Sequence, residues 1–144
     1  MEKFITNNVS ETVEVGKKFA LRLKQGDFIA LYGDLGAGKT AFVSGIANEL
    51  IPDAYVHSPT YALVNEYEGN DIKICHFDMY RIQDEDDLYS IGFYDYIYIG
   101  NDIIIVEWCE KIPYALPDEY YKVTIEKTEE NIDTRNITIE KVYK

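Results

Sequence analysis

Blocks of apolar and polar residues along the chain predict alternating strands and helices. The apolar run 28–32 lies between Gly26 and Gly33, which is typical of a short buried strand. After Lys39, apolar residues recur at helical spacing until Pro52, which predicts a helix that ends there. A strand, a glycine-containing turn and a helix therefore follow one another directly.

Shorter patterns predict an edge strand and two more helices. Residues 3–6 are β-rich and precede Ser10, whose side chain favours the N-cap of a helix running to about Lys24. An acidic helix is predicted over 84–91, where Gly92 follows as a C-cap residue. Helices are therefore expected both before and after the buried strand.

The remaining patterns are extended. Ranges 61–67 and 72–77 are joined by a short polar turn, and 120–127 and 136–142 alternate apolar with polar residues. Each pair predicts an antiparallel hairpin. The aliphatic run 103–106 shows no alternation, which is typical of a central strand with both faces covered.

Residues 33–40, Gly-Asp-Leu-Gly-Ala-Gly-Lys-Thr, match the phosphate-binding pattern G-x-x-x-x-G-K-[ST] without a mismatch. Gly33, Gly36 and Gly38 permit backbone angles and close approaches that a Cβ atom would block. The loop N–H groups and the start of the following helix then surround an anion. The alternative, a glycine turn that only joins strand to helix, is disfavoured by the full match and its flanks.

Each polar residue of this loop has an expected role. Lys39 is expected to reach the β- and γ-phosphates of a nucleotide, and the Thr40 hydroxyl to bind Mg²⁺. With this loop, residues 1–144 are expected to form a single P-loop domain. Its fold class is α/β, a P-loop NTPase-type three-layer α/β/α core with a mixed sheet and antiparallel hairpin additions.

The net charge narrows the choice of partners. There are 26 acidic against 14 basic residues, a net charge of −12, so free-standing nucleic-acid binding is disfavoured and any RNA contact is expected through a basic partner. No apolar run is long enough for a membrane span, and the first residues lack a signal-peptide pattern. A cytoplasmic protein without membrane contact is expected.

Two carboxylates are candidates for organising metal and water. A P-loop NTPase has such a carboxylate at the carboxyl end of a strand beside the P-loop strand. Glu107, directly after the run 103–106, has that position, and Asp78 ends another predicted strand. The alternatives are a solvated strand-terminal glutamate and an ion pair between Asp78 and Arg81.

Two nearby segments leave their interpretation open. The segment Ser58-Pro59-Thr60-Tyr61 has the place of a switch whose hydroxyl senses the γ-phosphate, but Ser-Pro is also ordinary turn chemistry. His76 is interpreted as a structural hydrogen-bonding residue, because P-loop hydrolysis has no general need for histidine. Trp108 is interpreted as packing near the site.

The scarcity of arginine bears on the type of reaction. Only Arg22, Arg81 and Arg135 are present, whereas nucleotide and small-molecule kinases typically close an arginine-bearing lid over the transferred phosphoryl group. A slow NTPase that needs help from a partner is therefore favoured over two alternatives. One is a small-molecule kinase, and the other is a nucleotide-gated binding module without steady turnover.

Five segments occur together, and in this order, in a known family. They are the loop 33–40, Ser58-Pro59-Thr60-Tyr61, Leu63-Val64-Asn65-Glu66-Tyr67, His76-Phe77-Asp78-Met79-Tyr80-Arg81 and Glu107-Trp108. With them the chain resembles, over nearly its whole length, the TsaE family (older name YjeE). The resemblance implies a subunit that binds ATP or ADP with Mg²⁺ and hydrolyses ATP weakly. It also implies that the subunit acts with TsaD-like and TsaB-like partners. Their complex adds a threonylcarbamoyl group to adenosine 37 of tRNAs that read codons beginning with A. The subunit is therefore expected to contact tRNA only through that complex.

The resemblance also assigns roles to single residues. It implies that Lys39 and Thr40 bind phosphate and Mg²⁺, and that Glu107 is the second metal-side carboxylate. Asp78 matches a position needed for activity, and Thr60 lies in the switch-like segment.

In the nucleotide loop the resemblance extends to neighbouring positions. The implied nucleotide contacts include Ala37 and Ala41, where Ala41 stands in place of a frequent second threonine and keeps only its backbone N–H. By the same analogy, Arg135 lies over the nucleotide base.

Overall fold

The computed structural model describes residues 1–34, 36–59 and 63–143, and its core is one seven-stranded mixed sheet with the strand order β1-β7-β6-β2-β5-β4-β3. The predicted switch residue Thr60 lies outside the described residues. The strands are β1 (Glu2–Thr6), β2 (Phe28–Tyr32), β3 (Val64–Glu68), β4 (Lys73–Asp78), β5 (Ile103–Glu107), β6 (Glu119–Lys127) and β7 (Arg135–Tyr143). The helices are α1 (Val9–Ala20), α2 (Lys39–Leu50), α3 (Glu85–Ser90) and α4 (Phe93–Tyr98), with short 3₁₀ turns η1 (Cys109–Lys111) and η2 (Pro113–Ala115).

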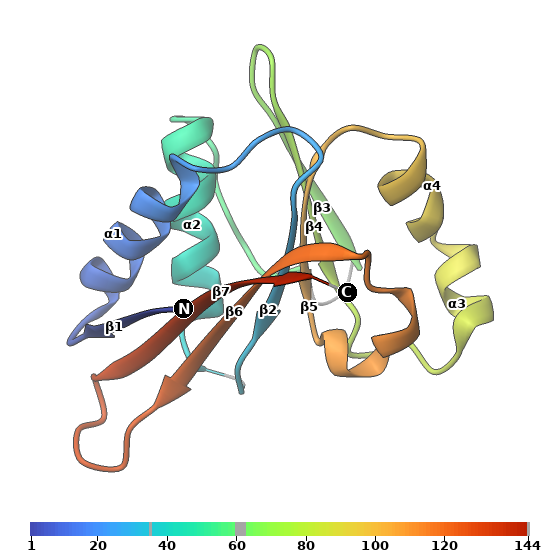
Figure 1. Ribbon diagram of the computed structural model, residues 1–144. Coiled ribbons are helices and arrows are strands. Elements are labelled where there is room, and N and C mark those ends of the chain that lie inside the picture. Colours follow the sequence, from blue (N-terminus) through green and yellow to red (C-terminus); the bar gives the residue numbers. More distant parts are fainter. Residues whose placement is uncertain (35, 60–62, 144) are drawn as a thin grey trace.

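The sheet is parallel in the middle and antiparallel at both sides. Strands β6, β2, β5 and β4 run parallel, whereas β3 pairs antiparallel with β4, and β7 and β1 extend the other side antiparallel. Helices α1 and α2 cover one face, and α3 and α4 lie on the other (Figure 1). The predicted three-layer α/β/α core with a mixed sheet and antiparallel hairpins is confirmed.

Successive side chains of β2 point to opposite faces of the sheet, and both faces are covered by helices. Ile29 and Leu31 pack in the cluster under α1 and α2, whereas Phe28 and Ala30 pack in the cluster under α3 and α4. Strand β5 is buried at all five positions and lies between β2 and β4. The prediction of a central strand without alternation is therefore confirmed.

Helices α1 and α2 touch through their backbones. A Cβ atom built on Gly16 would lie 2.3 Å from the carbonyl oxygen of Phe42, and one on Gly45 would lie 2.1 Å from that of Val13. Only glycine permits this approach, because backbone atoms cannot move aside as a side chain can. Helix α1 is thereby held directly against α2.

Two helix predictions need correction. Helix α1 begins after Asn8 rather than Ser10, because the Asn8 side chain accepts a hydrogen bond from the Glu11 N–H at 2.9 Å. The helix ends at Ala20, and the chain continues in tighter i→i−3 turns instead of reaching Lys24. Helix α4 was not predicted, because its tyrosine-rich sequence has strand propensity and its start depends on the left-handed Gly92.

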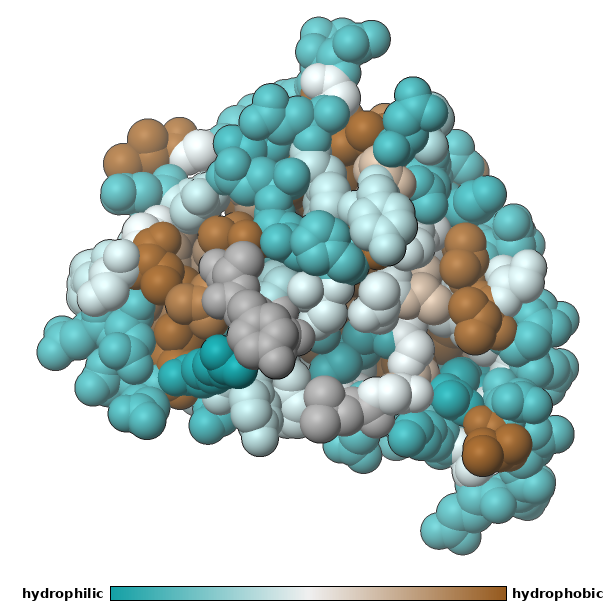
Figure 2. All heavy atoms as spheres, turned by 180° about the vertical axis from the view of Figure 1, so that it is seen from behind, coloured by the Kyte–Doolittle hydropathy of each residue, from teal (hydrophilic) through white to brown (hydrophobic). Residues whose placement is uncertain are grey.

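The face opposite to the one seen in Figure 1 is mostly polar. Figure 2 shows hydrophilic side chains over most of the face seen there, with apolar side chains in small separate groups. No helix within the described ranges is long and apolar enough to cross a lipid bilayer.

Candidate nucleotide site

The glycine loop leaves the start of α2 open to a ligand. Gly38 adopts the left-handed region with φ 110° at the N-cap, and no side chain caps the helix there. The first N–H groups of α2 therefore have no capping side chain, which is the arrangement that binds phosphate at helix N-termini. Gly33 has φ 154°, and a Cβ atom there would lie 2.7 Å from the Ile125 carbonyl oxygen. The loop thus needs glycine at both ends.

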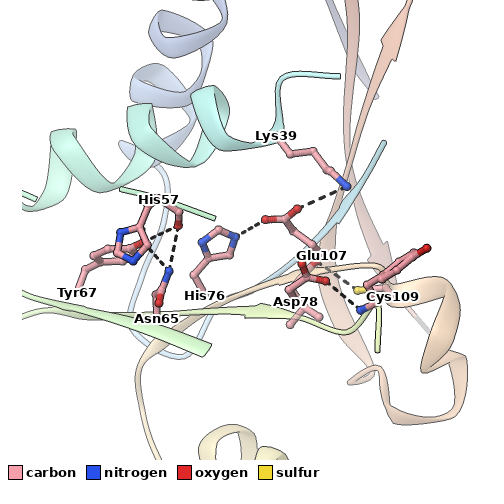
Figure 3. A network of polar contacts seen from close by, with 10 residues as sticks. Lys39, His57, Asn65, Tyr67, His76, Asp78, Glu107 and Cys109 are labelled. Atoms are coloured by element: carbon pink, nitrogen blue, oxygen red, sulfur yellow. Dashed lines mark hydrogen bonds and ion pairs between the residues drawn. The ribbon is translucent and has the colours of Figure 1, made fainter. Parts of the chain in front are cut away.

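Three charged residues converge beside this helix start. Lys39 projects from the first turn of α2, while Asp78 and Glu107 end β4 and β5 and are paired in register. All three are buried, with 4–6% of their surface exposed. The Lys39 ammonium lies 3.5 Å from Glu107 Oε1 (Figure 3). The predicted grouping of these residues is therefore observed, at the carboxyl ends of parallel strands.

Glu107 also contacts His76 from the neighbouring strand. His76 Nε2 lies 2.6 Å from Glu107 Oε2, and the ring is fully buried (Figure 3). Burial alone would raise the pKa of Glu107, but the His76 hydrogen bond and the charge of Lys39 lower it below its usual value. Glu107 is therefore a carboxylate at neutral pH.

The second carboxylate has a different environment. Burial raises the pKa of Asp78, the hydrogen bond that Asp78 Oδ1 accepts from the Tyr80 N–H at 2.9 Å opposes this, and the nearby charge of Glu107 raises the pKa further. Two carboxylates close together disfavour each other's charge. A cation placed between them would relieve that cost.

Aromatic rings border Lys39. Its ammonium lies 4.6 Å from the centroid of the Trp108 ring, and the Trp108 and Tyr80 rings meet edge to face at 5.0 Å. Trp108 has φ 61°, in the left-handed region, which turns the chain sharply after β5. In this conformation Lys39 is held by Glu107 and Trp108, where a nucleotide would present phosphate.

These residues surround a cavity of about 400 Å³, here called the phosphate-side cavity. It is lined by Gly36, Gly38, Lys39, Thr40, Ser58, Asp78, Tyr80, Arg81, Glu107 and Trp108. The segment that carries Ser58 is tied to β3, since Asn65 Nδ2 donates to the His57 carbonyl at 3.0 Å (Figure 3). The glycine loop, the segment of Ser58 and the two strand ends at Asp78 and Glu107 therefore all contribute to the lining of this cavity.

A second hollow lies on the other side of the loop, and we call it the α1-side hollow. It has a volume of about 550 Å³ and is lined by Asn8, Val9, Ser10, Thr12, Gly36, Gly38, Ala41, Asp133 and Arg135. Gly36 and Gly38 line both spaces. A nucleotide bound along the loop would therefore have room for phosphates on one side and for a nucleoside on the other.

Arg135 reaches the loop backbone from β7. Its Nε donates to the Ala37 carbonyl at 2.8 Å, and its NH2 group to the Gly36 carbonyl at 3.3 Å. These bonds tie the backbone of the loop to the last hairpin. The predicted position over a nucleotide base stays a prediction, and the observed contact is with the loop itself.

Sequence reasoning missed some of these residues. The contact between His76 and Glu107 was not predicted, although His76 and Asp78 share one face of β4 and that pattern places both toward α2. Asn8, the N-cap of α1, and Thr12 of α1 carried no local signal for a ligand, since only tertiary packing brings them to the loop.

The residues present fit a nucleotide with Mg²⁺. Within the described part of the chain, no group of three or more His, Cys, Asp or Glu side chains is arranged to hold a metal ion. Mg²⁺ is commonly bound by one or two protein oxygens together with substrate phosphates and water. Thr40 and Glu107, which line the same cavity beside the uncapped helix start, have such oxygens.

Comparison with known proteins shows the family of the chain. Residues 6–137 match the family described as Threonylcarbamoyl adenosine biosynthesis protein TsaE. The chain belongs to the TsaE family. A Bacillus subtilis relative named tRNA threonylcarbamoyladenosine biosynthesis protein TsaE is 37% identical over 136 residues, which cover 94% of this chain and 83% of the relative. A Haemophilus influenzae relative of the same name is 38% identical over 86% of this chain and 79% of its own.

A solved structure is similar over the whole fold. The crystal structure of Bacillus subtilis YdiB superposes with a TM-score of 0.78 and 31% identity, covering 99% of this chain and 86% of that one. The resemblance of the chain to the TsaE family is therefore confirmed. The relatives' names place them in tRNA threonylcarbamoyladenosine biosynthesis.

Proposed function

We propose that this chain is the ATP-binding, weakly ATP-hydrolysing subunit needed for threonylcarbamoyl modification of adenosine 37 in tRNAs that read A-starting codons. The observation that supports this most is the convergence of buried Lys39, Asp78 and Glu107 on an uncapped P-loop helix, in a chain of the TsaE family. Such a set of groups is suited to transfer of a phosphoryl group to water.

The chain's own residues have distinct tasks in this proposal. Lys39 leaves Glu107 and neutralises charge that develops on the transferring phosphoryl group, together with the loop N–H groups. Thr40 and Glu107 would hold Mg²⁺, which when bound withdraws electron density from the phosphate oxygens. Asp78, beside Glu107 in register, orients the attacking water.

We propose that partners complete the reaction. A TsaD-like and a TsaB-like protein would accept this subunit, and ATP hydrolysis would support turnover of their complex. The net charge of −12 favours contact with tRNA through those proteins only. The cytoplasmic location expected from the sequence stays a prediction.

Steady-state phosphate release from Mg-ATP tests the proposal. Slow release by the purified chain, rising when TsaD-like and TsaB-like proteins and tRNA are added, is the expected result. An unchanged rate with partners that bind would contradict the assignment.

The same assay addresses the two other interpretations. Phosphate transfer to an added small-molecule acceptor would support a kinase. One product released per bound ATP, followed by a stall in the presence of the partners, would support a nucleotide-gated binding module.

A further inference from the structure

His76 is a buried polar residue to which the proposed function gives no task. It lies on β4 two residues before Asp78, so both side chains point to the α2 side of the sheet. Its register partner on β5 is Ile105, one pleat away from Glu107 on the same face. The imidazole therefore lies diagonally beneath Glu107, deeper in the protein.

The two Glu107 oxygens have separate partners. Oε2 lies 2.6 Å from His76 Nε2, and Oε1 lies 3.5 Å from the Lys39 ammonium (Figure 3). The first contact is short, and its donor belongs to β4, which is paired on both sides, with β5 and β3. The second is longer, and its donor is the end of a flexible side chain that a phosphate group would attract.

The unpartnered side of the ring argues against a role in packing alone. His76 Nδ1 is buried and has no hydrogen-bond partner among the residues that the structure describes. An apolar side chain would fill the same space without leaving a polar atom unpaired. The one hydrogen bond that the ring makes there, with Glu107, is what the histidine contributes.

We propose that His76 is the positioning residue that keeps Glu107 in place when Lys39 turns to a bound nucleotide. This inference rests on the proposed function. Once Lys39 contacts phosphate, the Oε1 atom of Glu107 loses its partner and becomes available to Mg²⁺ and water. His76 still holds Oε2, so the carboxylate does not swing with the lysine, and its free oxygen faces the phosphate-side cavity.

Three variants separate this role from a structural one. Glutamine places a side-chain N–H near the position of imidazole Nε2, whereas the shorter asparagine places it near Nδ1, and leucine has none. The experiment measures ATP turnover with the partners, ADP affinity without Mg²⁺, and the Mg²⁺ concentration that half-saturates the increase in ADP affinity.

His76→Asn and His76→Leu are expected to lower turnover and raise the half-saturating Mg²⁺ concentration, each by about tenfold or more. Their affinity for ADP without Mg²⁺ is expected to stay within about twofold of the parent, because Lys39 and the loop are intact. His76→Gln is expected to restore most of the turnover and to bring the half-saturating Mg²⁺ concentration back close to that of the parent. In a Glu107→Gln background, His76→Asn should add little, since the two residues act as one unit.

Several outcomes would overturn the inference. His76→Asn with parental turnover and parental Mg²⁺ dependence would do so, as would equal losses in the asparagine and glutamine variants. If His76→Leu fails to fold, the difference in turnover and Mg²⁺ dependence between His76→Asn and His76→Gln still tests the positioning role. If the parent binds Mg-ADP but never turns over ATP, the proposed function fails, and the Mg²⁺ dependence of ADP binding still tests His76.

Discussion

The two spaces beside the P-loop differ in how their walls are built. The phosphate-side cavity takes Lys39, Asp78 and Glu107 from a helix start and two strand ends, and all three are buried. The α1-side hollow is lined by the exposed start of α1 and by Arg135 from the last hairpin. Buried charges carry a desolvation cost and are held in place by their partners, whereas the charged residues in the described lining of the α1-side hollow are Asp133 and Arg135. In the proposed function, the chemistry takes place in the first space and the nucleoside is recognised in the second.

The largest effect is expected from Lys39→Ala, which removes the central charge of the phosphate-side cavity. ATP turnover should fall by about 10²- to 10³-fold, because the developing phosphoryl charge loses its buried cation. The turnover is measured as steady-state phosphate release from Mg-ATP in the presence of the partner proteins. Lys111→Ala, at an exposed lysine near the Tyr80 ring, is the control and should keep parental turnover. Parental activity of Lys39→Ala would disprove the assignment of the site.

A smaller but still large effect is expected where α1 packs directly on α2. Gly45→Ala forces a Cβ atom against the Val13 carbonyl, so α1 must move away from α2. The free energy of unfolding should fall by about 1–3 kcal/mol, measured by urea denaturation. Glu49→Ala, exposed on the same helix, is the control. A variant as stable as the parent would show that the helices separate without cost.

Arg135→Ala tests which space Arg135 serves. Because its guanidinium donates to the Gly36 and Ala37 carbonyls, its loss should weaken ADP and pyrophosphate alike, by about tenfold. Calorimetric titration with both ligands measures this, and Arg22→Ala, remote from the loop and paired with Glu2, is the control. Weaker ADP binding with unchanged pyrophosphate binding would instead place Arg135 over the base, as the family resemblance implies.

The smallest effect concerns Asp78 and pH. Burial raises the pKa of Asp78 and the charge of Glu107 adds to this, so the folded state holds the proton more tightly than the unfolded state. The charged carboxylate therefore lowers stability as pH rises from the ordinary pKa through the raised one, and the full cost is present above it. Asp78→Asn should unfold about 2 °C higher than the parent at neutral pH, with lower ATPase activity.

Thermal unfolding across a pH series checks this prediction. The gain of Asp78→Asn should shrink as pH falls through the raised pKa and vanish below the ordinary one. Asp53→Asn, at an exposed position, should show no such trend. A gain that persists at low pH would assign the effect to something other than the carboxylate charge.

Most of the site could be predicted from local patterns. The loop 33–40, the carboxylate after the aliphatic run, and the aspartate at the end of β4 each follow a strand, and parallel strands bring their carboxyl ends to one edge. Helix boundaries were less predictable. Asn8 competes with Ser10 as a cap, and the aromatic segment of α4 resembles a strand until Gly92 and packing on the sheet make it helical.

The sequence by itself determined most of the strands and helices, though not α4, and it placed a phosphate-binding loop between β2 and α2. The spacing of apolar residues and the residue types of the glycine loop are local properties, so a short stretch of chain is enough to encode them. Only the tertiary structure decided that His76 supports Glu107 from the next strand, and that Arg135 reaches Gly36 across 99 residues of chain. Such contacts depend on strand order and helix packing, which arise from burial of the whole core rather than from any one segment.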